Sequence, residues 1–172
     1  MLAAQRRTQP LAAAKLSKER LESIYIRIFS EIEREINSKL INFNRVVYGG
    51  DRNAPQLRIK GANSFSFTSA TDTGTGNAYA GMIGFDLAIL SLTGLPFLIH
   101  DSVIYKNIEV PATRNILRIL AAVKRKQVFL SFDEASKFGE RAAQILHAKA
   151  VLKLNKDELL YSRDWKAKAD VS

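Results

Sequence analysis

The sequence contains no cysteine and only two histidines, His100 and His147. The absence of cysteine excludes disulfides, thiol catalysis and any zinc or iron–sulfur centre held by thiolates. Two histidines also exclude a metal site built from several imidazoles. The chain lacks the pattern G-x-x-x-x-G-K-[ST], so it has no P-loop of its own that would cradle the phosphates of a nucleotide. A complete, stand-alone P-loop nucleoside triphosphatase is therefore excluded.

Long apolar runs are also scarce. The first residues lack the apolar core of a secretory signal. The run from Ala78 to Ile99 carries a single charge, Asp86, and is long enough to cross a bilayer of about 30 Å. However, glycines dilute it and Thr93-Gly94-Leu95-Pro96 interrupts it. A buried helix followed by a buried strand is the better interpretation, and we expect a cytoplasmic protein that does not bind membranes.

The 172 residues are 47% hydrophobic and 25% charged, which is typical of one globular domain. The net charge is +9 and is unevenly distributed: +4 over residues 1–48, −1 over residues 49–102 and +6 over residues 103–172. A positive surface attracts polyanions such as DNA, and it also promotes solubility, so both explanations stay open. Lys124-Arg125-Lys126 is most simply the last turn of a helix, where basic residues are favoured.

The N-terminal part predicts one long helix from about Pro10 to Asn44. Apolar residues recur there every four positions and form one face, the pattern of an amphipathic helix: Ile24, Ile28, Ile32, Ile36 and Leu40. Residues 1–20 are rich in alanine and charge, and they suggest the end of a coiled-coil-like helix, although no strict heptad is present. Residues 21–172 are then predicted to form a single domain.

Alternation of apolar and polar residues predicts two short strands after this helix. The segments Gln56–Lys60 and Ser64–Thr68 flank Gly61-Ala62-Asn63, so an antiparallel hairpin is expected. A polar loop with two glycines follows at residues 71–77, and it opens an apolar helix from Ala78 to Leu92.

The second half alternates strands with helices. The strands are predicted at Leu95–Ile99 and Gln127–Phe132, each covered on both faces because it is wholly or largely apolar. Helices are predicted at Ala112–Lys126 and, capped by Asp133, at Glu134–Ala148. A closing hairpin is expected from residues 150–154 and 158–162. The order implies an α/β fold with a parallel sheet, preceded by the long helix and the small hairpin.

Two places in this arrangement suit phosphate chemistry. Ligands of open α/β sheets bind at the carboxyl ends of the strands, and Asp101 follows the apolar strand that ends at Ile99. The loop Thr73-Gly74-Thr75-Gly76-Asn77 precedes a helix, so its amides favour an anion. Each feature also has a plain structural explanation, as a cap or a turn. His100 and Asp101 are adjacent on a strand and point to opposite faces, which argues against a proton relay between them.

The order of these elements resembles the C-terminal lobe of the ATPase heads of SMC-like and RecN-like coiled-coil proteins, which belong to the ABC class. More narrowly, Leu95-Pro96-Phe97-Leu98-Ile99-His100-Asp101-Ser102 looks like an uncharacterised C-terminal domain of bacterial coiled-coil ATPases. The resemblance covers nearly the whole chain. It implies the parallel-sheet half of an ABC-type head, with residues 1–20 ending the coiled coil and residues 21–172 forming the lobe.

The resemblance also implies roles for individual residues. Thr73, Gly74, Thr75, Gly76 and Asn77 would form the signature loop, which contacts the γ-phosphate of ATP held by the other head of a dimer. The strand Leu95–Ile99 would be the Walker B strand, with Asp101 supporting Mg²⁺. The implied partners are an N-terminal Walker A lobe, a second head and DNA.

Two positions depart from the family pattern. Ser102 stands where the catalytic Glu normally follows the Walker B Asp, and Phe132 stands at the position of the switch His. Without that Glu, the attacking water lacks its usual base. His100 and Glu134 are nearby candidates to replace it. Asp101 and Ser102 are thus the catalytic positions implied, and whether ATP is hydrolysed stays open. The isolated chain is expected neither to bind ATP well nor to hydrolyse it.

A second interpretation comes from another class of protein. The chain would be a stand-alone basic binding or assembly module, in which the N-terminal helix pairs with a partner and residues 73–77 are only a turn. A third, a small hydrolase using Asp101 and His100, is weak because no nucleophile lies in a recognisable elbow.

Overall fold

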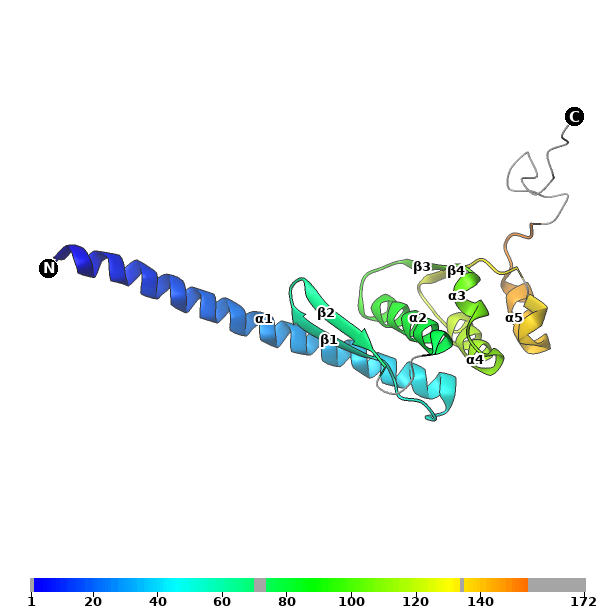
Figure 1. The fold of residues 1–172 in the computed structure, drawn as a ribbon. Helices are drawn as coiled ribbons and strands as arrows, with labels where there is room; N and C mark the ends of the chain where they lie inside the picture. The colour runs from blue at the N-terminus through cyan, green and yellow to red at the C-terminus, as the bar shows by residue number, and fades with distance from the viewer. Residues whose placement is uncertain (1, 70–73, 134, 155–172) are drawn as a thin grey trace, which may run out of the picture.

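The computed structural model describes residues 2–69, 74–133 and 135–154, with side chains from residue 13 onward. Its first element is a single long helix, α1 (Leu2–Tyr48), which is longer at both ends than the sequence pattern predicts. The N-terminal half of α1 projects away from the rest of the chain, whereas the C-terminal half packs against the other elements (Figure 1). The helix is continuous across residue 20, and the domain boundary placed there stays a prediction.

The end of α1 is fixed by glycines and by a side chain from far along the chain. Gly49 and Gly50 adopt positive φ angles of 68° and 98°, which glycine tolerates without a steric penalty. The amide of Gly49 donates to the carbonyl of Arg45 at 2.9 Å. The amide Nδ2 of Asn115 donates to the carbonyl of Val47 at 3.0 Å. These contacts satisfy carbonyls that the end of a helix leaves without a partner.

The predicted hairpin is confirmed. Strands β1 (Gln56–Gly61) and β2 (Ser64–Thr68) pair antiparallel, with Leu57 opposite Phe67. Helix α1 covers the free edge of β1, because the side-chain amide of Asn37 accepts from the amide of Leu57 at 2.8 Å and donates to its carbonyl at 3.0 Å. One turn earlier, the carboxylate of Glu33 accepts from the amide of Ile59. Helix α1 therefore binds the free edge of β1 at Leu57 and Ile59.

The remaining elements alternate in type, as expected for an α/β chain. They are α2 (Thr75–Leu92), β3 (Phe97–His100), α3 (Val103–Lys106), α4 (Val110–Ala121), β4 (Gln127–Leu130), the 3₁₀ helix η1 (Ala135–Phe138) and α5 (Glu140–Lys149). Strands β3 and β4 pair in parallel, with His100 opposite Leu130. The fold is thus a small α/β arrangement with a two-stranded parallel sheet and a separate hairpin. No helix in the described ranges is long and apolar enough to cross a membrane.

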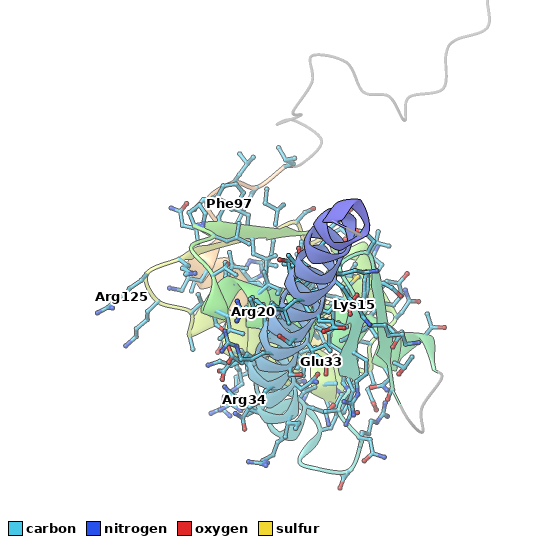
Figure 2. The ribbon with its side chains drawn as sticks, turned by 90° about the vertical axis from the view of Figure 1, so that its left-hand side faces the viewer. Lys15, Arg20, Glu33, Arg34, Phe97 and Arg125 are labelled. Atoms are coloured by element: carbon cyan, nitrogen blue, oxygen red, sulfur yellow. The ribbon has the colours of Figure 1, made fainter. Side chains whose placement is uncertain are left out.

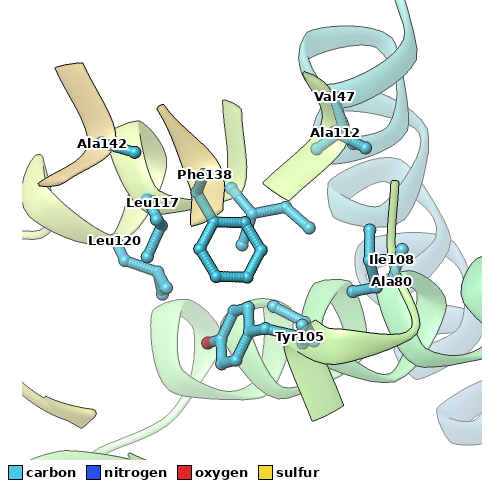
Figure 3. Packing of buried hydrophobic residues seen from close by; sticks show 11 residues of the cluster. Val47, Ala80, Tyr105, Ile108, Ala112, Leu117, Leu120, Phe138 and Ala142 are labelled. Carbon is cyan, nitrogen blue, oxygen red and sulfur yellow. The ribbon is translucent and has the colours of Figure 1, made fainter. Parts of the chain in front are cut away.

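Two apolar clusters hold these elements together. One lies between α1, α2 and the hairpin and centres on Leu40, which is completely buried. The other lies between α2, α3, α4, η1 and α5, and Tyr105, Phe138 and Leu117 pack at its centre (Figure 3). The same four-residue apolar stripe of α1 that enters the first cluster at Ile36 and Leu40 is exposed further toward the N-terminus.

Several predicted features of the second half are wrong in detail. Strand β3 is not covered on both faces, because Phe97 and Ile99 are exposed. Phe97 lies at the outer surface of the molecule in Figure 2. Within residues 150–154 there is no strand, and the other half of the predicted closing hairpin lies outside the described residues. Hydropathy shows that a segment is apolar, but it does not show whether residues of the same chain cover that segment.

The run Lys124-Arg125-Lys126 is not the last turn of a helix. Helix α4 ends at Ala121, and the run forms the connection to β4, with Arg125 at a positive φ of 65°. Lys126 turns back to the end of α2, where its ammonium donates to the carbonyl of Thr93 at 2.6 Å and to that of Leu90. Its charge thus stabilises the C-terminus of α2, a helix end different from the one predicted.

Candidate functional site

The carboxyl end of the parallel sheet brings together the residues that follow its two strands. The amide of Ser131, after β4, donates to the carbonyl of His100 at 3.0 Å and extends the pairing past the last strand residue. Asp101 and Ser102 follow β3 at this edge, and Asp133 follows β4. The sequence predicted Asp101 here, but it did not predict that Asp133 would stand beside Ser102.

Asp101 and Ser102 begin the turn into α3. Asp101 is exposed, whereas Ser102 is only 6% exposed, and its hydroxyl donates to Oδ1 of Asp101 at 3.3 Å. The carbonyl of Ser102 accepts from the amides of Tyr105 and Lys106 at 3.0 and 3.2 Å. These bonds close the first turn of α3 and hold the exposed carboxylate of Asp101 at the end of β3.

Asp133 carries a second carboxylate at the same edge. Its Oδ2 accepts from the ammonium of Lys106, on α3, at 2.5 Å. This hydrogen bond holds the pKa of the Asp133 carboxyl below its ordinary value, and the hydroxyl of Ser102 lowers it further. The predicted role of Asp133 as a helix cap is wrong, because η1 intervenes and α5 begins only after Gly139. Glu134 lies outside the described residues.

His100 faces the interior and links three elements. Its Nδ1 lies 2.7 Å from the hydroxyl of Tyr105 on α3, and its Nε2 lies 3.1 Å from Oδ2 of Asp86 on α2. An ionised carboxylate only accepts, so Nε2 donates to Asp86, and in the neutral ring Nδ1 accepts from the Tyr105 hydroxyl. Burial raises the pKa of the Tyr105 phenol well above its ordinary value, and the charge of Asp86 adds to this.

The contacts of His100 also show how His100 and Asp101 are oriented relative to each other. His100 is 5% exposed and Asp101 is exposed, so the two side chains point to opposite sides, as the strand geometry predicts. Both ring nitrogens of His100 contact side chains of α2 and α3, so the histidine is turned away from the carboxyl edge. The signal that the sequence analysis left unused was Asp86, the one charge in an apolar helix, which requires a buried polar partner.

The predicted signature loop is shorter than expected. Thr73 lies outside the described residues, and Gly74 is the N-cap of α2. Thr75, Gly76 and Asn77 belong to the first turn of the helix, so placing them in a loop before it is wrong. The turn starts early because Asn77 is buried and its amide donates to the hydroxyl of Ser69 at 3.2 Å.

Gly76 lies directly against another part of the chain. A Cβ on Gly76 would lie 2.5 Å from the carbonyl oxygen of Asn107, so this glycine permits close packing of α2 on the α3–α4 connection. Gly76 therefore has a structural role.

The structure places the start of α2 against the end of α3. Gly76 packs on Asn107, one residue after Lys106, whereas Asp86, ten residues further along α2, reaches His100. Ten helical residues correspond to about 15 Å. Helix α2 thus contacts both the end of α3 and the end of β3.

The oxygen donors at the carboxyl edge only partly fit the Mg²⁺ ion that the resemblance to SMC-like ATPase heads implies. Asp101 offers a free carboxylate beside the Ser102 hydroxyl, and Mg²⁺ in nucleotide sites commonly takes one or two carboxylates together with phosphates and water. No group of three or more potential metal-ligating residues occurs among the described residues. At the switch position, Phe132 packs between Tyr105 and Phe138, with ring centroids 5.3 and 5.2 Å apart, and offers no polar contact.

A polar cleft of about 460 Å³ lies between the end of α1 and the start of the hairpin. Its lining contains two arginines and no carboxylate: Ile41, Asn44, Arg45, Arg52, Asn53, Ala54, Gln56 and Thr68. Arg52 packs over the Tyr48 ring at 4.6 Å and pairs with Glu109. Across the described part of the chain, no ion pair involves Arg45. The cleft is therefore cationic.

The outer face of the β3–β4 sheet is apolar and uncovered. Phe97, Ile99 and Phe129 are 49%, 66% and 46% exposed, and they share one face because Ile99 stands opposite Phe129. The rings of Phe97 and Phe129 meet edge to face at 6.1 Å. Among the described residues each of these strands pairs only with the other.

Comparison with known proteins places the chain in a family without adding a function. No curated protein matches it. Residues 32–164, more than half of the chain, match the model of the family described as "Uncharacterised protein conserved in bacteria (DUF2326)". The match begins within α1 and spans both strand pairs and the carboxyl edge of the sheet. The chain is thus a member of this bacterial DUF2326 family.

Proposed function

We propose that the chain is the C-terminal lobe of an SMC-like ATPase head. It would supply the signature segment at Gly74–Asn77 and the Walker B strand β3 for ATP-dependent dimerisation of heads, coupled to DNA binding. The observation that carries the proposal is the uncovered β3–β4 sheet, with Asp101 at its carboxyl end.

Among the described residues the parallel sheet has two strands, and one of its faces is uncovered. Parallel sheets are found with both faces covered, whereas the face of Phe97, Ile99 and Phe129 is open. Full burial of one such side chain stabilises a protein by about 1.5–3 kcal/mol. A second lobe that adds strands and covers this face would gain a part of that amount from each residue. The missing Walker A lobe is the partner that the resemblance implies.

The carboxyl edge supports the nucleotide part of the proposal. The second lobe would bring the phosphate-cradling loop, because this chain has none. Mg²⁺ neutralises the charge that develops on the phosphates, and Asp101 would hold it through a carboxylate oxygen. Lys106 places an ammonium at the same edge, where it would attract the phosphates.

The N-terminus of α2 supports the dimer part. Helix α2 has 18 residues, and its first amides have no partner within the helix. Such a helix end favours an anion, here one held by another head.

The cationic cleft supports the DNA part. Arg45 and Arg52 come from the end of α1 and the segment after it, and the amides of Asn53 and Gln56 add hydrogen-bonding groups. Guanidinium groups bind phosphates through paired donors. Binding to DNA at this place would fall steeply with salt, because counterions are released.

The test uses a head assembled from this chain and an N-terminal Walker A lobe of the same family. Its mass is measured by light scattering with and without Mg-ATP. The wild-type head is expected to double its mass with ATP. Gly74→Leu should block this, because its side chain would stand at the N-cap of α2, where the anion would bind. Gly61→Leu, at a glycine of the hairpin whose Cβ would meet nothing within 4 Å, should not. A wild-type head that stays monomeric with ATP contradicts the proposal, as does normal dimerisation of Gly74→Leu.

A second candidate function is favoured by the exposed stripe on α1. Leu21, Tyr25, Ile28 and Ile32 lie on one face at spacings of four, three and four residues, which is the spacing of a coiled-coil seam. In this alternative the chain is a basic assembly module that pairs through α1 without nucleotide chemistry. Partner binding that persists without ATP and is unaffected by Gly74→Leu would favour the module.

A further inference from the structure

The carboxyl edge of the sheet lacks one group that ATP hydrolysis needs. At the position after Asp101, where the related ATPases have a Glu, this chain has Ser102. A serine hydroxyl does not take up a proton at neutral pH, and the hydroxyl of Ser102 donates to Asp101. If the assembled head hydrolyses ATP, the attacking water therefore needs another carboxylate or imidazole.

Three nearby groups can be compared. His100 is buried, and both of its ring nitrogens are in contact with other side chains. Phe132 is apolar and packs in the core. Asp133 is different, because its carboxylate is exposed, follows the neighbouring parallel strand and stands beside Ser102.

We propose that Asp133 is the residue that orients and deprotonates the attacking water, in place of a Glu at position 102. This inference rests on the proposed function. Ser102 lies between the two carboxylates, in contact with Oδ1 of Asp101 and with the carboxylate of Asp133. The carboxylate of Asp101 is thus assigned to the metal and that of Asp133 to the water. Both follow strands of the same parallel pair.

The proposed step is a phosphoryl transfer to water. The water oxygen forms a bond to the γ-phosphorus, and the bond from this phosphorus to the bridging β–γ oxygen breaks. The products are ADP and inorganic phosphate. Asp133 accepts the proton that leaves the water and returns it to solvent after the phosphate departs, so the carboxylate is regenerated.

Lys106 has a separate part in this arrangement. Its ammonium pairs with the Asp133 carboxylate at 2.5 Å and holds it at this edge of the sheet. The Lys106 side chain is itself partly exposed, so an approaching γ-phosphate can share its charge. Lys106 is thus a positioning residue for Asp133.

The experiment compares variants of the assembled head in two assays, steady-state ATP hydrolysis and the lifetime of the ATP-bound dimer. Asp133→Asn should lower kcat by about 10²–10⁴-fold, the usual contribution of a general base, and leave KM nearly unchanged. It should also prolong the life of the dimer, because ATP is consumed more slowly. Asp51→Asn, at an exposed aspartate after α1, is the matched control and should leave both readouts unchanged.

Two further variants separate a catalytic from a structural role. Asp133→Glu keeps the carboxylate and should retain part of the activity. Ser102→Glu introduces the Glu that SMC-like ATPases have at this position. It should restore ATP hydrolysis to the Asp133→Asn head if the two positions serve the same water. A merely structural defect would not be rescued in this way.

The outcomes distinguish this inference from the function on which it rests. A wild-type head that does not dimerise with ATP overturns both. A wild-type head that dimerises without hydrolysing ATP overturns only the role of Asp133. The same holds for a head whose kcat and dimer lifetime are unchanged by Asp133→Asn.

Discussion

Among the described residues the two sheets each have two strands, but other parts of the chain cover them to different extents. In the β1–β2 hairpin, Leu57 is buried against α1 and α2, and the side chains of Asn37 and Glu33 bind the free edge of β1. In the β3–β4 sheet, the inner face packs on the helices, while Phe97, Ile99 and Phe129 remain on an open outer face.

This difference distinguishes a sheet that packs against helices of its own chain from a sheet with an exposed apolar face. In the hairpin, Leu57 packs against α1 and α2, and α1 binds the edge of β1 at Leu57 and Ile59, although Phe65 of β2 is 72% exposed. The β3–β4 end leaves apolar surface exposed beside the carboxylates of Asp101 and Asp133, so it is the end that a second lobe would complete.

The largest effect is expected where the first cluster is densest. Leu40→Ala should lower the free energy of unfolding of the chain by about 2–5 kcal/mol, because Leu40 is completely buried between α1 and the hairpin. Ile99→Ala, on the open sheet, should cost about 0.5 kcal/mol or less. Urea unfolding of both variants measures this. Equal losses would mean that the β3–β4 face is covered within the isolated chain.

The closed edge of the hairpin gives the second prediction. Asn37→Ala should cost about 1–3 kcal/mol, because the amide and carbonyl of Leu57 both lose their side-chain partner in a partly buried place. Asn63→Ala, in the exposed turn of the same hairpin, is the matched control. Thermal unfolding followed by circular dichroism compares the two. An Asn37→Ala protein as stable as wild type would show that water serves this edge equally well.

The start of α2 gives the third prediction. Gly76→Ala should destabilise the chain by about 1–3 kcal/mol, since its Cβ would lie 2.5 Å from the backbone oxygen of Asn107. Gly94→Ala, just after the other end of α2, should change stability by less than about 0.5 kcal/mol, because a Cβ there would meet nothing within 4 Å. Urea unfolding of the pair measures the difference. The reverse order of stabilities would contradict the division into a packed and an open glycine.

The smallest effect concerns pH at the open sheet. Because Lys106 lowers the pKa of Asp133 in the folded state, this ion pair contributes stability at pH values above the unfolded pKa of about 4. That contribution is lost as pH falls through the lower folded pKa. Lys106→Gln should therefore lose less stability than wild type on acidification from about pH 5 to pH 2. Lys124→Gln, in the connection to β4, serves as control, and parallel acid profiles for all three proteins would contradict the prediction.

The sequence predicts local structure better than it predicts contacts. The hairpin follows from strict alternation around Gly61-Ala62-Asn63, and α1 follows from its four-residue stripe, because both signals are local. Asp101 at the carboxyl end of β3 follows from the same reasoning. These features depend on neighbours in the sequence, so one chain without relatives is enough to find them.

Other features depend on residues far apart and could not be found in this way. The pairing of Lys106 with Asp133 joins positions 27 residues apart, and the position of Lys126 on the end of α2 joins it to Leu90, 36 residues away. The fit of Gly76 on Asn107 likewise appears only once α2 and the α3–α4 connection are placed. Exposure of β3 was missed for a different reason: an apolar strand looks the same whether its cover comes from its own chain or from another.

Hydrogen exchange of the chain with and without the N-terminal Walker A lobe tests the central claim most directly. We expect the backbone amides of β3 and β4 to exchange more slowly when the lobe is bound, and the exchange rates in β1 and β2 to stay unchanged. Unchanged exchange in β3 and β4, or slowing confined to the hairpin, would contradict the claim that the parallel sheet is where the second lobe completes this chain.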